Sequence, residues 1–320
     1  MTKWKNQAFV QACIDETEKI IIGKREQLSF MMMSILSGGH ILLDDLPGSG
    51  KTTLVRTLSI VLGCDFRRIQ FTPDLLPSDI IGMNIYNQKL GDFQLMQGPV
   101  QTNILLADEI NRAIPRTQSA LLEAMEERQV TIDGISRKLP EPFLVMATQN
   151  PVESESTFRL PAAQMDRFFV RLSLGYPSEA EEVLMLSRLG DRTPYENLQR
   201  IVSPERIMEM KKEVEGVYVS EHVKTYIVSL VHKTRGHKML KQGASPRASR
   251  SLYQGGKAWA YMQGRDYVIP EDIKTILPAI LTHRISLTNE AKYRGESEDI
   301  FVKHIISECP VPPLKEDLFP

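Results

Sequence analysis

The sequence has little net charge, few cysteines and no long apolar run. Its 39 lysine and arginine residues are balanced by 40 aspartate and glutamate residues, which leaves a formal net charge of −1. A dedicated nucleic-acid binder usually carries a large basic excess, so the composition argues against that class. The three cysteines, Cys13, Cys64 and Cys309, are scattered along 320 residues. This spacing argues against a disulfide framework and favours a reducing compartment.

Segments that would direct the chain into or across a membrane are not found. The first residues, from Met1 to Gln7, lack the apolar core that a signal peptide requires. The most apolar stretch, from Leu28 to Leu36, is far shorter than the roughly 20 residues that span a bilayer. We therefore expect a protein without a membrane span that works in the cytoplasm.

Apolar runs of strand length alternate with helical stretches in the first half of the chain. The runs are His40–Asp44, Asn103–Ala107, Phe143–Ala147 and Phe168–Leu174. Such alternation predicts an α/β fold with a parallel sheet that helices cover on both faces. After Pro177, serine and proline residues that begin helices recur, and the pattern predicts no further strand. We therefore predict an α/β domain over residues 1–176 and an all-helical domain over residues 177–320.

Two stretches of the α/β half have the pattern of β-hairpins. Asn84–Pro99 carries polar residues at its centre, with Tyr86 and Phe93 among the apolar residues that flank them. Gln129–Leu139 carries the dipeptide Asp133-Gly134, which suits a turn that needs positive φ. We expect both hairpins to be inserted between the strands and helices of the α/β domain.

The strongest motif, Leu42–Thr52, begins in an apolar strand, continues through glycines and ends at the start of a helix. Glycines let backbone N–H groups surround phosphate oxygens, and the helix N-terminus adds its dipole. Lys51 is expected on the β- and γ-phosphates and Thr52 on Mg²⁺. Asp45 stands where the general pattern has its first glycine, which leaves nucleotide affinity open. The predicted nucleotide-binding residues are Pro47, Gly48, Ser49, Gly50, Lys51, Thr52 and Thr53.

A pair of carboxylates follows a second buried strand directly. Asp108 and Glu109 come after the apolar run that ends at Ala107. Beside a phosphate loop, such a pair suits metal-assisted hydrolysis. Asp108 would hold Mg²⁺, and Glu109 would polarise the water that attacks the γ-phosphate. The sequence therefore predicts ATP hydrolysis, and the guanine-reading segment of a GTPase is not found.

Five elements in register resemble those of the AAA+ ATPases and, within them, of the MoxR family. They are Leu46-Pro-Gly-Ser-Gly-Lys-Thr52, Leu106-Ala-Asp-Glu-Ile-Asn-Arg112, Ala147-Thr-Gln-Asn-Pro151, Leu160-Pro-Ala-Ala-Gln-Met-Asp-Arg-Phe168 and Gly243-Ala-Ser-Pro-Arg247. The resemblance covers nearly the whole chain. It implies a P-loop AAA+ domain with two β-hairpin inserts, followed by an all-helical lid domain.

The resemblance also implies roles for residues outside the phosphate loop. Asn150 is similar to the sensor 1 residue that holds the attacking water or a γ-phosphate oxygen. Arg167 resembles the arginine finger that completes a neighbouring subunit's site. Arg247 resembles sensor 2, which would reach the γ-phosphate from the lid. Ile22-Gly23 is similar to the segment that packs on adenine, although a helix that ends at a glycine gives the same pattern.

Assembly and partners follow from the resemblance as well. It implies a homo-oligomeric ring, most simply a hexamer, that binds ATP and Mg²⁺ and acts on partner proteins as a chaperone. Proteins with von Willebrand-type domains are among the expected partners. Tyr86 and Phe93 of the first hairpin are interpreted as mostly structural, with client contact as the other interpretation. A DNA-stimulated motor is the alternative function, although the near-neutral charge makes nucleic acid an unexpected partner.

Overall fold

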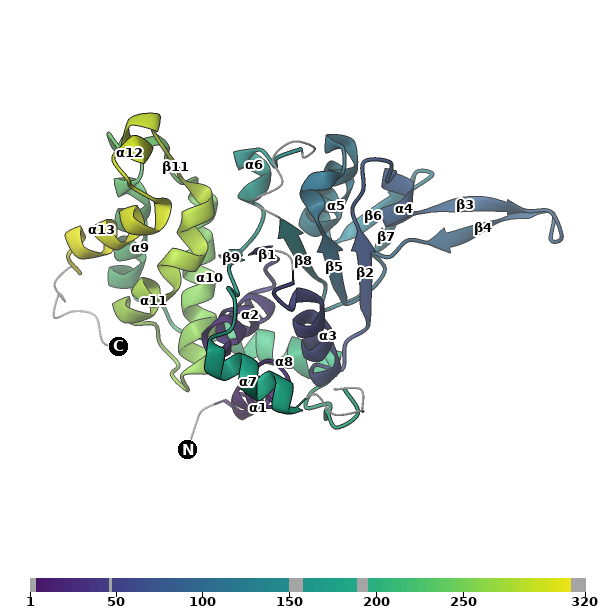
Figure 1. Cartoon of the computed structure of the whole chain (residues 1–320), viewed down its shortest axis with the longest axis horizontal. Coiled ribbons are helices and arrows are strands. Elements are labelled where there is room, and N and C mark those ends of the chain that lie inside the picture. Colours follow the sequence, from purple (N-terminus) through teal and green to yellow (C-terminus); the bar gives the residue numbers. More distant parts are fainter. Residues whose placement is uncertain (1–3, 46–47, 150–157, 189–194, 312–320) are drawn as a thin grey trace.

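The computed structural model describes residues 4–45, 48–149, 158–188 and 195–311. A five-stranded parallel sheet lies at the centre of the first half of the chain (Figure 1). In spatial order its strands are β2 (Phe66–Gln70), β5 (Ile104–Asp108), β8 (Leu144–Gln149), β1 (Ile41–Asp44) and β9 (Val170–Leu172). The α/β fold with a parallel sheet that the sequence predicted is therefore confirmed.

Strand β2 is the member of the sheet that the apolar pattern failed to predict. It lies at one edge of the sheet, and of its five residues only Ile69 is buried. The central strands β5 and β8 are apolar because helices cover both of their faces. An edge strand has less apolar surface to bury, so its sequence pattern is weaker. The omission matters because β2 carries two side chains of the site described below.

The side chains of the sheet divide between two hydrophobic cores, one on each face. Along β1, Ile41 and Leu43 belong to the core that contains α3 (Lys51–Val61), whereas Leu42 belongs to the core under α5 (Pro115–Glu127). This alternation follows from the period of two in a strand. The other helical elements of this half are α1 (Ala8–Glu18), α2 (Arg25–Ser37), α4 (Pro77–Ile81), η1 (Ile110–Arg112) and α6 (Ala162–Met165).

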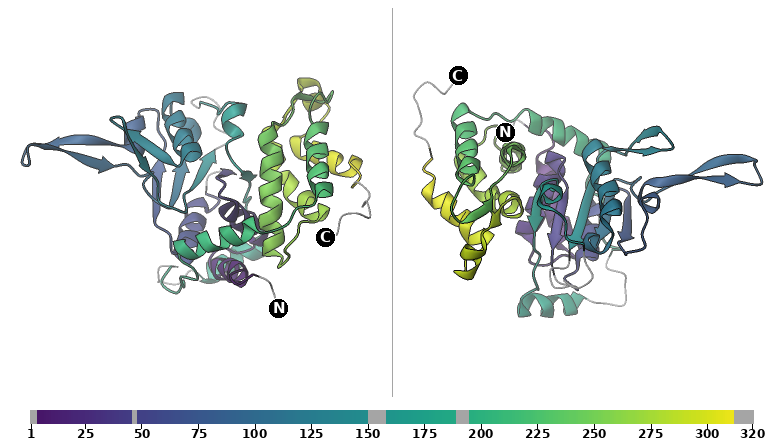
Figure 2. Two further views of the ribbon diagram at one scale, coloured as in Figure 1. Left: turned by 180° about the vertical axis from the view of Figure 1, so that it is seen from behind. Right: turned by 90° about the horizontal axis from the view of Figure 1, so that it is seen from above.

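Both predicted hairpins are present. Strands β3 (Gly82–Asn87) and β4 (Asp92–Gln97) form one, and β6 (Gln129–Ile132) and β7 (Ile135–Lys138) form the other. The turn at Asp133-Gly134 has φ values of 49° and 79°, as the dipeptide predicted. The β3–β4 hairpin extends well away from the sheet (Figure 1), on the side opposite the C-terminal helices (Figure 2).

Several apolar side chains of the β3–β4 hairpin are exposed, which does not fit the interpretation that they are structural. Tyr86 is 53% exposed and Phe93 is 66% exposed, and their rings contact each other edge to face. Leu90 and Met96 are 64% and 60% exposed. Leu95 of the hairpin packs against the core under α5, whereas these four exposed side chains belong to neither core. A projecting apolar surface of this kind commonly marks an interaction site.

Helices dominate the chain after Pro177, and we call this part the lid. They are α7 (Glu179–Arg188), α8 (Pro204–Glu215), α9 (Glu221–Lys233), α10 (Pro246–Met262), α11 (Pro270–Leu281), η2 (Thr282–Arg284), α12 (Asn289–Tyr293) and α13 (Glu298–Glu308). Serine side chains accept N-terminal N–H groups at Ser203, Ser220 and Ser245, as predicted. The prediction of no further strand was wrong in one detail, because β10 (Leu240–Gln242) and β11 (Ser286–Leu287) form a short antiparallel ribbon.

One hydrophobic core joins the sheet to the lid. Helix α2 packs against α8 and α10, and a single cluster of buried residues runs from Ile41 of the sheet through Met32 to Leu252 and Ile276 of the lid. The predicted boundary between residues 176 and 177 therefore separates the part of the chain that contains the sheet from the part that is mostly helical. It does not divide the hydrophobic core, which extends across both parts. None of the described helices has the length and apolar character needed to cross a bilayer.

Candidate functional site

The phosphate loop has the backbone conformation that its glycines predicted. Gly48 and Gly50 have φ values of 81° and 79°, a region that side chains with a Cβ rarely adopt. A Cβ added to either glycine would meet no atom within 4 Å, so there is room for a side chain. Glycine is favoured at these positions because of the backbone conformation. Gly50 is the N-cap of α3, whose first turn begins at Lys51. The loop thus ends at the N-terminus of α3, where the helix dipole favours an anion.

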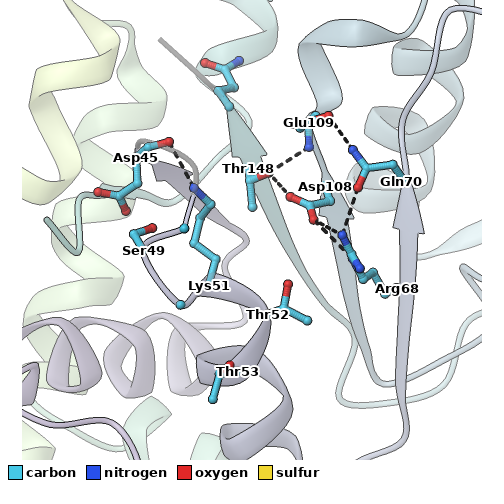
Figure 3. A pocket seen from close by; sticks show the side chains of 13 residues that line it. Asp45, Ser49, Lys51, Thr52, Thr53, Arg68, Gln70, Asp108, Glu109 and Thr148 are labelled. Atoms are coloured by element: carbon cyan, nitrogen blue, oxygen red, sulfur yellow. Dashed lines mark hydrogen bonds and ion pairs between the residues drawn. The ribbon is translucent and has the colours of Figure 1, made fainter. Parts of the chain in front are cut away.

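A cavity of about 390 Å³ opens beside this loop (Figure 3). The phosphate loop, β2, β5 and β8 contribute its walls. The described lining residues are Asp45, Gly48, Ser49, Gly50, Lys51, Thr52, Thr53, Arg68, Gln70, Asp108, Glu109, Thr148 and Gln149. The structure therefore brings the predicted phosphate-binding residues and the acidic pair into one cavity. The carboxyl ends of parallel strands meet at this edge, which is where ligands bind in open α/β sheets.

Two polar groups of the loop suit an incoming phosphate. Lys51 extends along the cavity, and its Nζ donates a hydrogen bond to the backbone carbonyl of Asp45 at 3.0 Å. The Ser49 Oγ is buried and has no hydrogen-bond partner among the described residues. A buried hydroxyl without a partner carries a desolvation penalty that a ligand oxygen would remove. The loop is thus built for an anion of phosphate type.

Asp108 is held from two sides. Its Oδ1 accepts a hydrogen bond from Thr148 Oγ1 at 2.6 Å, and its Oδ2 accepts one from Arg68 Nη2 at 2.7 Å. Thr148 lies on β8 and Arg68 on β2, the strands that flank β5. The carboxylate that was predicted to face Mg²⁺ therefore has a protein cation on one oxygen. A metal ion bound to that oxygen would compete with the Arg68 guanidinium for it.

Glu109 is held in an unusual conformation at the end of β5. Its φ of 56° and ψ of 49° place it in the left-handed region, which non-glycine residues avoid unless their surroundings impose it. Its N–H donates to Thr148 Oγ1 at 2.8 Å. Gln70 Nε2 donates to its Oε2 at 2.5 Å, and Arg112 forms an ion pair with the same oxygen at 3.1 Å. The carboxylate is thus restrained on the side of β2.

Sequence reasoning missed four residues of this cavity, namely Arg68, Gln70, Thr148 and Gln149. The first two lie on β2, which the apolar pattern did not reveal. The alternation of polar and apolar residues in Arg68-Ile-Gln-Phe71 was the available signal, because it places Arg68 and Gln70 on one face of a short strand. Thr148 precedes the predicted sensor residue by two positions and belongs to the motif from Ala147 to Pro151. Its hydroxyl links both acidic residues.

The donor set fits Mg²⁺ bound with a nucleotide better than a metal held by protein alone. Thr52 and Asp108 both line the cavity and offer oxygen atoms. No group of three or more histidine, cysteine, aspartate or glutamate residues with metal-binding geometry occurs in the part of the chain that the structure describes. Mg²⁺ is typically held by one or two protein oxygens together with phosphates and water. The pair Thr52 and Asp108 matches that pattern.

The two predicted arginines lie together in a different cavity. Arg167 Nη2 forms an ion pair with Glu126 Oε2 at 3.2 Å, and Arg247 pairs with Oε1 of the same carboxylate. Both arginines line a cavity of about 420 Å³ between α5, α8 and α10. Arg247 is not among the described residues that line the cavity at the phosphate loop, so its role as sensor 2 stays a prediction. Its helix begins at Pro246 as predicted, but that helix faces the cavity with Arg167.

A buried ion pair fixes the segment that carries Arg167. Arg284, from η2 of the lid, donates its Nε to Asp166 Oδ1 at 2.8 Å, and its side chain is 2% exposed. Its other nitrogens donate to the carbonyls of Phe168 and Phe169. Burial lowers the pKa of the Arg284 guanidinium to about 10, a fall that the Asp166 carboxylate opposes. Ser245 Oγ donates to Asp166 Oδ2 at 2.7 Å, so the lid holds this segment at two points.

The remaining predicted residues are outside these cavities or outside the described chain. Pro47 and Asn150 lie outside the described residues. Ile22 and Gly23 do not line the described cavity at the phosphate loop. Gly23 has a φ of 71° and lies against the side chain of Glu181 on α7. The adenine-binding role of Ile22 and Gly23 stays a prediction.

Comparisons with known protein families support the AAA assignment in both halves of the chain. Residues 40–170 match the profile of the ATPase family associated with various cellular activities. Residues 232–305 match the profile of the AAA lid domain. The first match contains the phosphate loop, the acidic pair and Arg167. The second lies within the lid.

Individual relatives match over nearly the whole chain. An uncharacterised protein YeaC of Bacillus subtilis is 47% identical over 93% of this chain and 93% of its own length. The chaperone MoxR1 of Mycobacterium tuberculosis is 41% identical over 95% of this chain and 82% of its own length. The crystal structure of a proposed ATPase from Cytophaga hutchinsonii superimposes with a TM-score of 0.91 and 42% identity, covering 96% of both chains.

Proposed function

The chain belongs to the MoxR family of AAA+ ATPases, and from this premise we propose that it binds ATP with Mg²⁺ and hydrolyses it in the cavity at the phosphate loop. The observation that carries the proposal is the shared cavity of Lys51, Thr52, Asp108 and Glu109. Two segments far apart in the sequence meet there because β1 and β5 end at the same edge of the sheet.

The predicted nucleotide-binding and acidic residues of the cavity have roles that their chemistry allows. Lys51 leaves the Asp45 carbonyl for the β- and γ-phosphates, while the backbone N–H groups at Gly48 and Gly50 bind further oxygens. Thr52 and Asp108 would hold Mg²⁺, which supplies charge stabilisation to the transferring phosphoryl group. Glu109 orients and polarises the attacking water. Asn150, the predicted sensor 1 residue, would hold that water or a γ-phosphate oxygen.

The arginines are proposed to act between subunits. Arg167 and Arg247 share the Glu126 carboxylate, and neither is among the described residues that line the phosphate-loop cavity of the same chain. An arginine finger from a neighbouring subunit stabilises the charge of the transition state and contributes roughly 10³–10⁵ in rate. We therefore place both arginines on the nucleotide of the adjacent subunit. A closed ring, most simply a hexamer, provides one such neighbour for every site.

We propose that hydrolysis drives the remodelling or maturation of partner proteins. A relative that is 41% identical is named a chaperone, and the β3–β4 hairpin projects apolar side chains such as Tyr86 and Phe93. Partners with von Willebrand-type domains remain the expectation from the family. Action on proteins is preferred to the DNA-stimulated motor because the chain has no basic excess. The cytoplasmic location stays a prediction.

The proposal is tested by the ATPase rate as a function of protein concentration, with and without single- and double-stranded DNA. We expect a specific activity that rises with concentration as rings assemble and that DNA leaves unchanged. Lys51→Ala should abolish ATP binding and turnover, whereas Lys224→Ala, at an exposed lysine of α9, should retain both. Unchanged ATP affinity in Lys51→Ala would remove the phosphate-loop assignment. Strong stimulation by DNA would favour the motor.

A further inference from the structure

Asp45 occupies the position where the general phosphate-loop motif has a glycine, and its side chain is 4% exposed. Its carboxylate accepts hydrogen bonds from the segment that follows β9. The donors are Ser173 Oγ at 2.7 Å, the Leu174 N–H at 2.8 Å and the Gly175 N–H at 3.0 Å. A carboxylate buried to this degree requires such partners, and here backbone and hydroxyl donors provide them.

The same segment links the sheet to the lid. We call residues 173–178 the linker, because β9 ends at Leu172 and α7 begins at Glu179. Beyond Asp45, Lys24 Nζ donates to the carbonyl of Tyr176 at 3.4 Å. In the first turn of α7, the side chain of Glu181 lies against Gly23. The linker therefore contacts the phosphate loop at one end, and at the other it contacts Lys24, which directly follows the predicted adenine-binding segment.

The backbone of Asp45 also contacts the phosphate-binding lysine. Its carbonyl accepts the hydrogen bond from Lys51 Nζ at 3.0 Å. One residue thus binds Lys51 through its backbone and the linker through its side chain. When Lys51 binds a phosphate instead, the Asp45 carbonyl loses the hydrogen bond from its ammonium group. The backbone of Asp45 thus responds to the ligand, and the side chain of the same residue binds the linker.

We propose that Asp45 is a positioning residue that couples occupancy of the phosphate loop to the linker, and through it to the lid. This inference rests on the proposed ATP binding. It explains an aspartate at a glycine position, because a glycine there would leave the Leu174 and Gly175 N–H groups without their acceptor. The neighbouring Asp44 pairs with Arg171 within the strands β1 and β9 and makes no hydrogen bond or ion pair with the linker among the described residues, which makes it a matched comparison.

The experiment measures hydrogen exchange at the Leu174 and Gly175 amides with and without Mg-ATP, in a Glu109→Gln background that retains the nucleotide. In the parent protein both amides should be protected, and Mg-ATP should change their exchange rates. Asp45→Asn should raise exchange at both amides about 10- to 100-fold, as expected for a lost charge-assisted hydrogen bond. It should also abolish the response to ATP while ATP still binds. Asp44→Asn should retain protection and response.

Two further variants keep the inference open to refutation. Asp45→Gly introduces the residue of the general motif and should reproduce the loss seen with Asp45→Asn. Ser173→Ala removes one donor to the same carboxylate and should weaken the ATP response in part, even if both Asp45 variants fail to fold. Parent-like exchange and ATP response in the variants that fold would overturn the coupling. Failure of the parent protein to bind ATP would instead refute the proposed function.

Discussion

The cavity at the phosphate loop and the cavity beside the lid differ in the charges they offer. The first has two basic side chains, Lys51 and Arg68, against the carboxylates of Asp45, Asp108 and Glu109. The second has six basic side chains against three acidic ones, and includes both Arg167 and Arg247. The first cavity thus offers a triphosphate the phosphate loop and the predicted Mg²⁺ ligands but only two basic side chains. The second cavity has an excess of basic side chains but lacks a phosphate loop.

The two cavities also differ in how firmly their charged groups are held. Around the phosphate loop, Asp108 is paired with Arg68, whose side chain is 48% exposed. Beside the lid, Asp166 is paired with Arg284, whose side chain is 2% exposed and also bonded to backbone carbonyls. An exposed ion pair can exchange partners when a ligand arrives, whereas a buried one holds its geometry. The nucleotide cavity is therefore expected to adapt to its ligand, whereas the backbone that carries Arg167 is held in place by the lid.

The largest effect is expected from breaking the chemistry of the first cavity. Glu109→Gln keeps the shape of the side chain but removes the charge that polarises water. The rate of hydrolysis should fall by roughly 10²–10⁴, while ATP binding is retained. Steady-state turnover together with equilibrium nucleotide binding checks both parts. The control Glu308→Gln, on α13 of the lid, should behave as the parent, and near-normal turnover of Glu109→Gln would displace Glu109 from its role.

The second largest effect is expected from removing the buried ion pair that holds the segment with Arg167. Asp166→Ala leaves the buried Arg284 guanidinium without its carboxylate, which should lower the free energy of unfolding by about 3–5 kcal/mol. Glu290→Ala breaks an ion pair with Arg294 in which both side chains are more than 70% exposed, and should cost less than about 1 kcal/mol. Denaturant unfolding of the two variants makes the comparison. An equal loss in the free energy of unfolding for the two variants would show that the buried Asp166–Arg284 pair stabilises the fold no more than an exposed pair does.

The smallest effect concerns the projecting hairpin. Tyr86 and Phe93 contact each other but lie outside both cores, so replacing both with serine should change the free energy of unfolding by less than about 1.5 kcal/mol. Phe301→Ala, at a lid aromatic that is 1% exposed, should cost about 3–5 kcal/mol. Thermal or denaturant unfolding distinguishes the two. A loss at the hairpin as large as that of Phe301→Ala would restore the structural interpretation of its aromatic residues.

The sequence allowed much of this architecture to be predicted. The phosphate loop and the Asp108–Glu109 pair could be recognised because each depends on a local order of strand, loop and helix. The edge strand β2 could not, because an edge strand need not be apolar, so Arg68 and Gln70 were missed with it. The partners of Asp45 and Arg167 depend on how distant segments meet, and a local pattern contains no such information.

The central claim is that one subunit supplies the phosphate loop and the next subunit supplies the arginines. Its most direct test is to mix Arg167→Ala subunits, which keep Glu109, with Glu109→Gln subunits, which keep Arg167. Each variant alone should hydrolyse ATP poorly. Mixed rings, verified by native mass spectrometry, should regain activity wherever an intact Glu109 meets a neighbour's Arg167. Mixed rings without any regained activity would contradict the account.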